Sequence, residues 1–244
     1  MFYQVIRAEM IKLRRAPVWI AFVALTALSA VMGTFNYLNN TGILTQRWYS
    51  LWTQHTLFAS FFFLPALLGV LCAYQWRLEH CENNWNALMT QPVPLWMLFG
   101  GKLTVAAGLA LLAQAATGLM YIASGLYAGF GLPLPPELPL WLAMGTCACV
   151  SVTAVQLLLS MVIRSFAPPV AIALAGGIAG LALANMGMGL YCPYSLIAMG
   201  MNANGTEMLK AEQYGAFFMA CAFFVGAAWI LAVAWLRRRD VSTR

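Results

Sequence analysis

Charged residues are scarce in this sequence. Only 8% of its 244 residues are Asp, Glu, Lys or Arg, and 62% are hydrophobic, whereas a soluble domain usually carries about 25% charged residues. This balance excludes an ordinary soluble domain and predicts a membrane protein. The formal net charge is +6, but the basic residues stand at the ends of apolar runs. That placement favours orientation in a bilayer over nucleic-acid binding.

Ionisable residues are also missing from the membrane-crossing parts of the chain. The apolar interiors of the predicted spans hold no Asp, Glu, Lys or Arg, and Lys102 and His55 are expected at span ends. Proton- and ion-coupled carriers keep such groups because their mechanism needs them, so the absence argues against a proton-driven carrier. Backbone oxygens can nevertheless hold an ion.

Several catalytic motifs are absent as well. No HExxH and no Ser/His/Asp set lies on a span, which argues against an intramembrane protease. No Gly-rich loop with Lys-Ser/Thr occurs either. This chain therefore is not expected to bind ATP in the P-loop manner, and no catalytic residue is predicted.

The cysteines do not form a recognisable framework. Four of the six lie in apolar runs, one lies in a polar stretch and one in a predicted outer loop, namely Cys72, Cys147, Cys149, Cys221, Cys81 and Cys192. Cys147 and Cys149 are two residues apart on a helix, so they face different sides and cannot share a metal. His80 beside Glu79 and Glu82 is most simply a solvated polar group, so no metal site is predicted.

Six segments are long and apolar enough to cross a membrane, which needs roughly 20 residues each. They run over residues 17–38, 55–76, 102–124, 139–163, 168–190 and 214–236. The predicted fold is all-α: one polytopic transmembrane domain over residues 1–244, with six transmembrane helices and an interfacial helix at its N-terminus.

The basic residues predict the direction of the spans. Eleven of the thirteen fall on one side of the predicted bilayer: Arg7, Lys12, Arg14, Arg15, Arg77, Lys102, Arg164, Arg237, Arg238, Arg239 and Arg244. Only Arg47 and Lys210 fall on the other. Because cytoplasmic loops carry the excess of Lys and Arg, both termini are expected in the cytoplasm. Residues 77–101 then form the one sizeable cytoplasmic loop.

The first sixteen residues precede the first span. Phe2, Ile6, Met10 and Leu13 share one helical face, and the charged residues lie mostly elsewhere. This spacing favours a helix in the inner membrane surface over an unstructured basic leader. A cleaved signal peptide is the competing interpretation. The apolar run after the leader is too long for it, so a retained span is expected.

The spans carry only mild polarity, concentrated on a few helix faces. The residues concerned are Gln114, Thr117, Tyr121 and Ser124 in the third span, Thr153, Gln156 and Ser160 in the fourth, and Asn185 deep in the fifth. They form either a weakly polar path for an amphiphilic substrate or ordinary interhelical hydrogen bonds, worth about 0.6 kcal/mol each. Gly176 and Gly180 form a GxxxG pair for close helix packing, within the chain or in a dimer.

The outer side holds aromatic residues and one long connection. Trp48, Tyr49 and Trp52 precede the second span and are expected at the outer headgroup level. The connection over residues 191–213 is mixed in character and long enough for one or two short helices.

The stretch RLEHCENNWNALMTQPVP, residues 77–94, is the most polar part between two spans. Asn83 or Asn84 can cap a short helix, and Pro92 ends it. Trp85, Leu88 and Met89 would form one apolar face of that helix. Such a face is costly to expose, so we expect a short cytoplasmic helix onto which a soluble partner docks. A plain surface connector is the alternative.

At these residues the chain resembles the membrane subunits of type-2 ABC exporters, and most of all the small permeases of lantibiotic-immunity transporters. The resemblance rests on the six-span layout, on the basic leader with EMIKLRR at residues 9–15, and on a loop pattern of acids, polar turn, Leu, Pro and Lys. The matching loop residues are Glu79, Glu82, Asn83, Asn84, Trp85, Asn86, Leu88, Pro92 and Lys102. Asn86 departs from the basic residue or Thr of many relatives.

The resemblance implies a function as well as a fold. The short helix would be a coupling helix that contacts a separate ATPase subunit through Glu79, Glu82, Asn83, Asn84, Trp85, Asn86, Leu88 and Met89. Two ATPase subunits would bind ATP and Mg, and two permease chains, identical or sister, would pair in a bacterial cytoplasmic membrane. The substrate would be a lantibiotic or another antimicrobial peptide expelled from the membrane. A drug or lipid exporter and a non-transporting sensor or assembly subunit remain alternatives.

Overall fold

The computed structural model describes residues 1–81, 84–203, 205 and 209–238, and this part of the chain is helical without strands. Six helices are long and apolar enough to span a membrane. They are α2 (Val18–Asn39), the continuous helix of α3 (Trp48–Phe58), η1 (Ala59–Phe63) and α4 (Leu64–His80), then α6 (Leu95–Tyr127), α7 (Leu138–Val162), α8 (Ala167–Asn185) and α10 (Tyr214–Arg237). The predicted all-α fold with six spans is confirmed.

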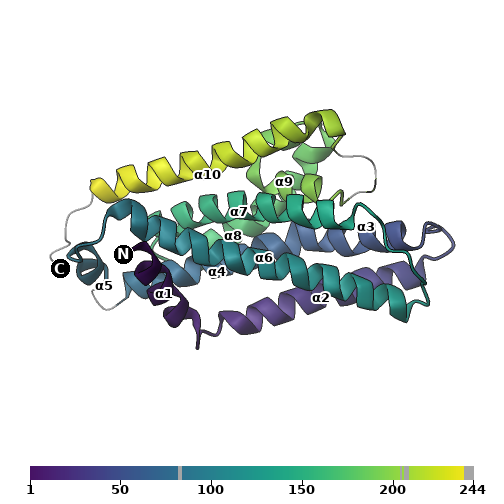
Figure 1. The fold of residues 1–244 in the computed structure, drawn as a ribbon, viewed down its shortest axis with the longest axis horizontal. Helices are drawn as coiled ribbons and strands as arrows, with labels where there is room; N and C mark the ends of the chain where they lie inside the picture. The colour runs from purple at the N-terminus through teal and green to yellow at the C-terminus, as the bar shows by residue number, and fades with distance from the viewer. Residues whose placement is uncertain (82–83, 204, 206–208, 239–244) are drawn as a thin grey trace.

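Shorter helices lie at the two ends of the bundle (Figure 1). At one end are α1 (Phe2–Leu13) and α5 (Asn84–Met89), together with the last turn of α10. At the other end are the start of α3, α9 (Pro193–Gly200), and the single turns η2 (Gly189–Tyr191) and η3 (Ala211–Gln213). The expected short helices in the connection over residues 191–213 are therefore present.

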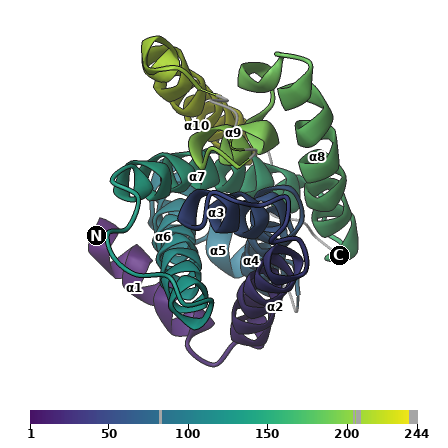
Figure 2. The same cartoon turned by 90° about the vertical axis from the view of Figure 1, so that its right-hand side faces the viewer.

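The helix α4 lies in the interior of the bundle, beside α7, with α2 and α8 on its flanks (Figure 2). The span Trp48–His80 is accordingly the most buried of the six, whereas α2, α8 and α10 expose most of their surface. The buried core at the α3 end is rich in aromatic rings. Trp52 stacks on Trp141 with ring centroids 5.4 Å apart, and it meets the ring of Tyr121 edge-on at 5.0 Å.

Lys102 and His55, expected at the ends of apolar segments, lie within helices that are longer than those segments. The helices around the second and third spans extend well beyond the apolar segments, so that His55 and Lys102 lie inside helices, each only 1% exposed. Hydropathy marks where a helix can cross hydrocarbon, whereas the helix itself continues as long as its backbone hydrogen bonds do. Buried ionisable side chains are thus present where none was expected.

The fifth span ends earlier than expected. Helix α8 stops at Asn185, because Gly187 adopts a φ of 74°, a left-handed conformation that glycine tolerates at a helix end. Asn185 is therefore the exposed last residue of the helix, and its expected place deep in the span is wrong.

A short π-helix interrupts the second span at residues 59–63. Pro65 follows it, and a proline ring clashes with the carbonyl four residues earlier in a regular α-helix, here that of Phe61. The widened turn displaces that carbonyl, and α8 packs directly against it. A Cβ atom added at Gly177 would lie 2.2 Å from the Phe61 oxygen, so only glycine allows this contact.

We predict that Gly177→Ala destabilises the protein by about 1–3 kcal/mol, because the added methyl group meets backbone rather than a flexible side chain. Thermal unfolding in a non-ionic detergent measures the change. Gly226→Ala on α10 is the matched control, since a methyl group added there would have no atom within 4 Å. Equal unfolding midpoints for the two variants would contradict the proposed contact.

Candidate functional site

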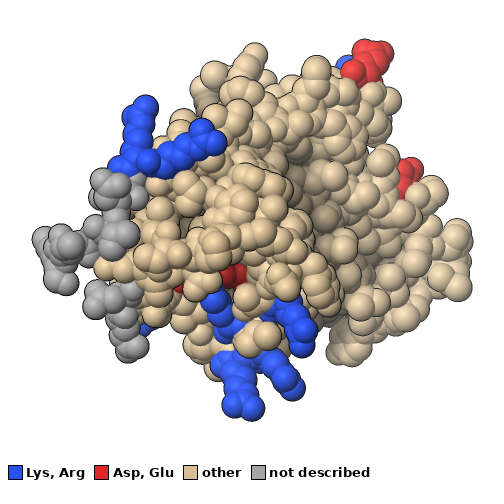
Figure 3. All heavy atoms as spheres, turned by 60° about the vertical axis from the view of Figure 1, so that its left-hand side comes forward, with Lys and Arg blue, Asp and Glu red and all other residues tan. Residues whose placement is uncertain are grey.

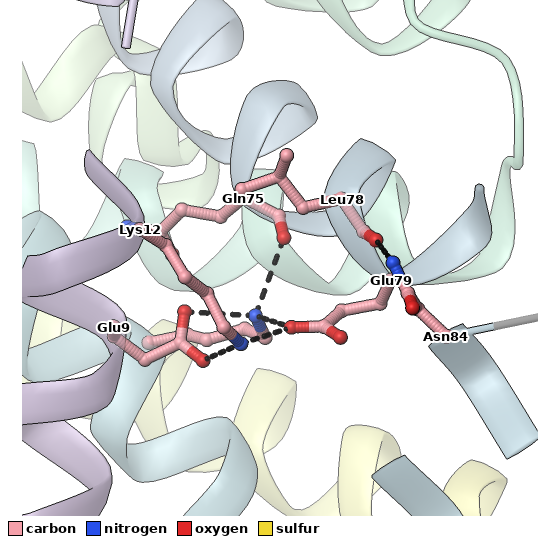
Figure 4. Close-up of polar contacts among 7 residues, drawn as sticks. Glu9, Lys12, Gln75, Leu78, Glu79 and Asn84 are labelled. Carbon is pink, nitrogen blue, oxygen red and sulfur yellow. Dashed lines mark hydrogen bonds and ion pairs between the residues drawn. The ribbon is translucent and has the colours of Figure 1, made fainter. Parts of the chain in front are cut away.

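Four ionisable side chains meet in the interior at the α1 end of the bundle (Figure 4). They come from three helices: Glu9 and Lys12 from α1, Glu79 from α4 and Lys102 from α6. Lys102 Nζ lies 2.9 Å from Glu9 Oε2 and 2.9 Å from Glu79 Oε1. Lys12 Nζ lies 2.7 Å from Glu9 Oε1 and 2.5 Å from Glu79 Oε1. Each ammonium group therefore bridges both carboxylates, and we call these residues the charge cluster.

The charge cluster is almost fully removed from solvent. The side chains of Glu9 and Glu79 are 6% exposed and that of Lys102 is 1% exposed, whereas Lys12 keeps a third of its surface. Burying a charge is costly unless it is paired and hydrogen-bonded. Two positive and two negative groups balance here, and removing one of them would leave a buried charge without its partner.

Lys102 is held by two further contacts. Its ammonium group donates to the backbone oxygen of Gln75 at 3.2 Å, and it lies 4.9 Å from the centre of the Trp76 ring. Both partners belong to α4, so Lys102 joins α6 to α4 by an ion pair, a hydrogen bond and a cation–π contact together.

The pKa of Lys12 follows from the same geometry. Burial lowers this pKa, but the charges and hydrogen bonds of Glu9 and Glu79 together outweigh burial, so the net direction is upward. A lysine with a raised pKa stabilises the fold at every pH below its unfolded-state value, and that contribution is lost only as the pH rises through the folded-state value. Lys12 therefore stays charged across the physiological range.

Two glycines bring α1 close enough to α6 for the charge cluster to form. A Cβ atom at Gly101 would lie 2.6 Å from Val5 Cγ1, and one at Gly100 would lie 3.4 Å from the Phe2 ring. The inward face of α1 thus carries apolar residues together with Glu9, and Met10 is 59% exposed. The expectation that Met10 shares the apolar face, with the charges elsewhere, is wrong because Glu9 has buried partners on α4 and α6.

Helix α5 lies directly beside the charge cluster. The side chain of Asn84 donates to the backbone oxygen of Leu78 at 2.9 Å. Trp85 stacks on His80 with ring centroids 5.6 Å apart, and it meets Trp235 of α10 edge-on at 5.6 Å. Helix α5 is therefore attached to α4 and α10 by specific contacts.

The apolar face of α5 differs from the expectation. Trp85, Leu88 and Met89 are half-buried and pack against the bundle, because the ends of α4 and α10 offer them apolar partners. Asn86 is half-buried too, and Ala87 is exposed together with Asn84. The predicted contact residues Glu82 and Asn83 lie outside the described residues.

A hollow of about 530 Å³ opens between α1, α5 and the start of α6. Its lining includes Val5, Glu9, Glu79, Ala87, Leu88 and Leu98. The hollow has mainly apolar walls and reaches the carboxylates of the charge cluster. A partner's side chain that entered it would contact three helices at once.

The mildly polar residues of the spans bond within the chain. Thr117 and Thr153 donate to carbonyl groups of their own helices, four residues back. Gln114 contacts two sulfur atoms, and Gln156 lies 2.6 Å from the hydroxyl of Tyr194. Ser160 differs, because its buried hydroxyl has no hydrogen-bond partner among the described residues, whereas its backbone oxygen lies 3.3 Å from His80 Nε2. The predicted path is thus an arrangement of buried groups on α6 and α7, separated from Asn185 at the exposed end of α8.

The GxxxG pair lies against α9 of the same chain. A Cβ atom at Gly176 would lie 2.6 Å from the ring of Tyr194, and one at Gly180 would lie 2.8 Å from the backbone nitrogen of Ser195. Close packing at these glycines positions α9 on α8.

The sequence predicts Glu79 and Lys102 as loop residues, but it does not predict the charge cluster that they form with Glu9 and Lys12. One signal was available. Glu9 is the only acid in a basic leader, and the pair Gly100-Gly101 directly precedes Lys102, so an acid and a close-approach site were both visible.

The fold and the charge cluster together define a multi-pass membrane protein whose N-terminal helix is fastened to the ends of two spans. A family model described as ABC-2 family transporter protein matches residues 5–180. The chain therefore belongs to this family and is a membrane component of a transporter. A comparison with curated proteins gives no match. The matched residues contain the whole charge cluster and α5, and membership implies partnership with an ABC ATPase.

We predict that Lys102→Met destabilises the protein by about 3–5 kcal/mol, because it leaves buried carboxylates with one ammonium group. The double variant Glu79→Gln with Lys102→Met keeps Glu9 paired with Lys12, so its loss should be smaller than the sum of the single losses. Denaturant unfolding in detergent measures both. Arg14→Met, at an exposed position on the same end, serves as the control. Strict additivity would show that the cluster does not act as a unit.

Proposed function

We propose that this chain is the permease subunit of an ATP-driven exporter in a bacterial cytoplasmic membrane, with both termini in the cytoplasm. Two ATPase subunits, which hold the ATP and Mg, bind at the end that carries α1 and α5. A second permease chain, identical or a sister, completes the transmembrane part. The chain itself is a non-catalytic subunit that converts movement of the ATPase into movement of its spans.

The distribution of charge supports this orientation. Basic side chains gather towards the end with α1 and α5 (Figure 3). Those among the described residues are Arg7, Arg14, Arg15, Arg77, Arg164, Arg237 and Arg238, besides the two lysines of the charge cluster. A bias of this kind marks the cytoplasmic side of membrane proteins. The exposed face of α1, with Tyr3, Arg7 and Ile11, then suits a surface of anionic headgroups.

The connection between α5 and the spans is the observation that carries the proposal. Through Asn84 and Trp85, α5 is attached to α4 and α10. The charge cluster then joins the end of α4 to α6 and α1. A push on α5 therefore reaches three spans and the interfacial helix as one unit, because separating them would expose unpaired buried charges.

The proposed cargo is a lantibiotic or another amphiphilic antimicrobial peptide, removed from the membrane to give immunity. Support for it comes from the resemblance of the leader and loop residues to lantibiotic-immunity permeases. The second candidate is export of another amphiphile such as a drug or lipid.

Reconstitution tests the energy source. The chain purified from its native membrane in mild detergent should bring along an ATPase whose Mg-dependent hydrolysis rises when the peptide is added. Proteoliposomes with the whole complex should move the peptide only with ATP. Uphill transport by the chain alone, or a native complex without ATPase activity, would refute the proposal. ATP-driven movement of a lipid or drug but not of the peptide would favour the second candidate.

We predict that Ala87→Arg lowers peptide-stimulated ATP hydrolysis at least several-fold without changing stability, because Ala87 is exposed on α5 and lines the hollow beside the charge cluster. Thr41→Arg introduces the same side chain at an exposed position at the opposite end and should have no effect. Hydrolysis is measured in proteoliposomes. A normal rate of peptide-stimulated ATP hydrolysis in Ala87→Arg would show that α5 is not part of the docking surface.

Trp85→Ala and Leu88→Asp should also uncouple hydrolysis from transport while the chain remains inserted. The physical reason for the expected loss of coupling differs from that given for Ala87→Arg. Trp85 anchors α5 on His80 and Trp235, so its loss should lower the unfolding midpoint as well. Unchanged peptide resistance and unchanged ATPase stimulation in both variants would contradict the coupling role.

A further inference from the structure

A second hollow lies at the end of the bundle away from the charge cluster. Its volume is about 650 Å³, within the range of small-molecule sites. The first turn of α3, the start of α7 and described residues between Met199 and Tyr214 line it. Three regions far apart in the sequence thus form one concave surface, and neither the fold family nor the coupling mechanism accounts for it.

One wall of this hollow is aromatic and acidic. Tyr49 of α3 donates its hydroxyl hydrogen to Glu137 Oε2 at 3.0 Å, which fixes the carboxylate at the start of α7. The Tyr49 ring also meets Trp141 edge-on, with centroids 6.0 Å apart. A carboxylate beside two aromatic rings favours an organic ammonium group, which is attracted both by the charge and by the ring faces.

The other wall is basic. Lys210 lines the hollow next to Ala211 and Tyr214, where α10 begins. The single turn η3 precedes α10 directly, and its acid Glu212 offsets the partial positive charge of the helix start. The cation of this wall is therefore the Lys210 ammonium group alone. The two walls carry opposite formal charges, a carboxylate at Glu137 and an ammonium group at Lys210.

Glu137 and Lys210 line the same hollow but form no ion pair with each other within the described part of the chain. Both side chains are exposed. Two opposite charges on different sides of one hollow match a ligand that carries both charges itself.

The base of the hollow is rigidly built. Trp52 is 1% exposed and donates its ring N–H to the backbone oxygen of Met201 at 2.7 Å. The next residue, Asn202, lines the hollow with a φ of 49°, a left-handed conformation that Asn tolerates better than most residues. The turn after α9 is thus fixed to α3, and a smaller hollow of about 230 Å³ adjoins it there.

We propose that this hollow binds the headgroup of a zwitterionic phospholipid with a primary amine, of the phosphoethanolamine type. The ammonium group lies against Glu137, Tyr49 and Trp141, and the phosphate lies against Lys210. Membrane lipid is the occupant because the hollow opens at the ends of the spans beside the exposed ring of Tyr49, a position that corresponds to the headgroup level of the bilayer. Trp48 and Trp52, expected at that level too, are buried in the bundle. The proposal is independent of the exporter's cargo and energy source.

Native mass spectrometry of the purified chain tests the site. The protein in non-ionic detergent is titrated with dioleoyl phosphatidylethanolamine and, separately, with dioleoyl phosphatidylglycerol, which carries the phosphate without an amine. We expect the ethanolamine lipid to be retained preferentially. We also expect free phosphoethanolamine to displace it. Retention that free phosphoethanolamine does not reduce would show binding through the acyl chains alone and overturn the proposal.

Two charge variants test the two walls. Glu137→Gln should lower retention of the ethanolamine lipid up to roughly fivefold, the factor for one partly exposed charged contact, and it should shift the preference towards phosphatidylglycerol. Lys210→Gln should lower retention of both lipids. Glu212→Gln is the matched control, because this acid lies at the same end and is absent from the lining.

The pattern across variants decides the outcome. Size-exclusion profiles and unfolding midpoints must match those of the parent, which both charge variants should satisfy because the replaced side chains are exposed. Identical lipid ratios in the parent and in Glu137→Gln would overturn the proposal. A shift in Glu212→Gln as large as that in Glu137→Gln would also overturn it, since the effect would then come from the net charge of that end.

Discussion

The pairing of two carboxylates with two ammonium groups inside the α1 end is the constraint on which the rest of this structure depends. Glu9, Glu79 and Lys102 are almost fully buried, and a buried charge without its partners is costly. Glu9 reaches the cluster only if α1 lies across α6, and Lys102 reaches it only if α6 begins before the apolar part of its span. The position of the interfacial helix, the length of α6 and the end of α4 are therefore linked, and they change together or not at all.

Such a linkage suits a membrane component that receives movement from a soluble partner. The helices of a bilayer protein have no hydrophobic drive to remain together, because lipid is as apolar as their side chains. A buried ionic junction supplies the missing specificity at the α1 end, where we propose that the ATPase docks. The aromatic contacts of Trp85 with His80 and Trp235 extend the junction to α10, so specific contacts join α1, α4, α5, α6 and α10 at this end of the bundle.

The sequence predicts the fold far better than it predicts the site. Six spans, the leader helix, the short helix near Trp85 and the helical connection before α10 all follow from apolar length, periodicity and proline positions. Hydropathy could not show that Lys102 and His55 lie inside helices. It reports how far a segment is apolar, whereas the length of a helix depends on how far its backbone hydrogen bonds continue. Gly187 stops α8 at Asn185 by a backbone conformation, and that conformation becomes visible only in the structure.

The charge cluster escaped prediction for a physical reason that applies widely to membrane proteins. Its members on different helices are 23 to 93 residues apart, so no local pattern joins them, and each alone has the appearance of a headgroup-facing charge. What separates them from the exposed arginines is their neighbours: Gly100 and Gly101 remove the side chains that would hold α1 away from α6. An acidic residue in a basic amphipathic leader, combined with paired glycines beside a lysine at the start of a span, therefore indicates a buried ionic junction. The paired glycines are the informative part of this pattern, because the charges alone fit a surface equally well.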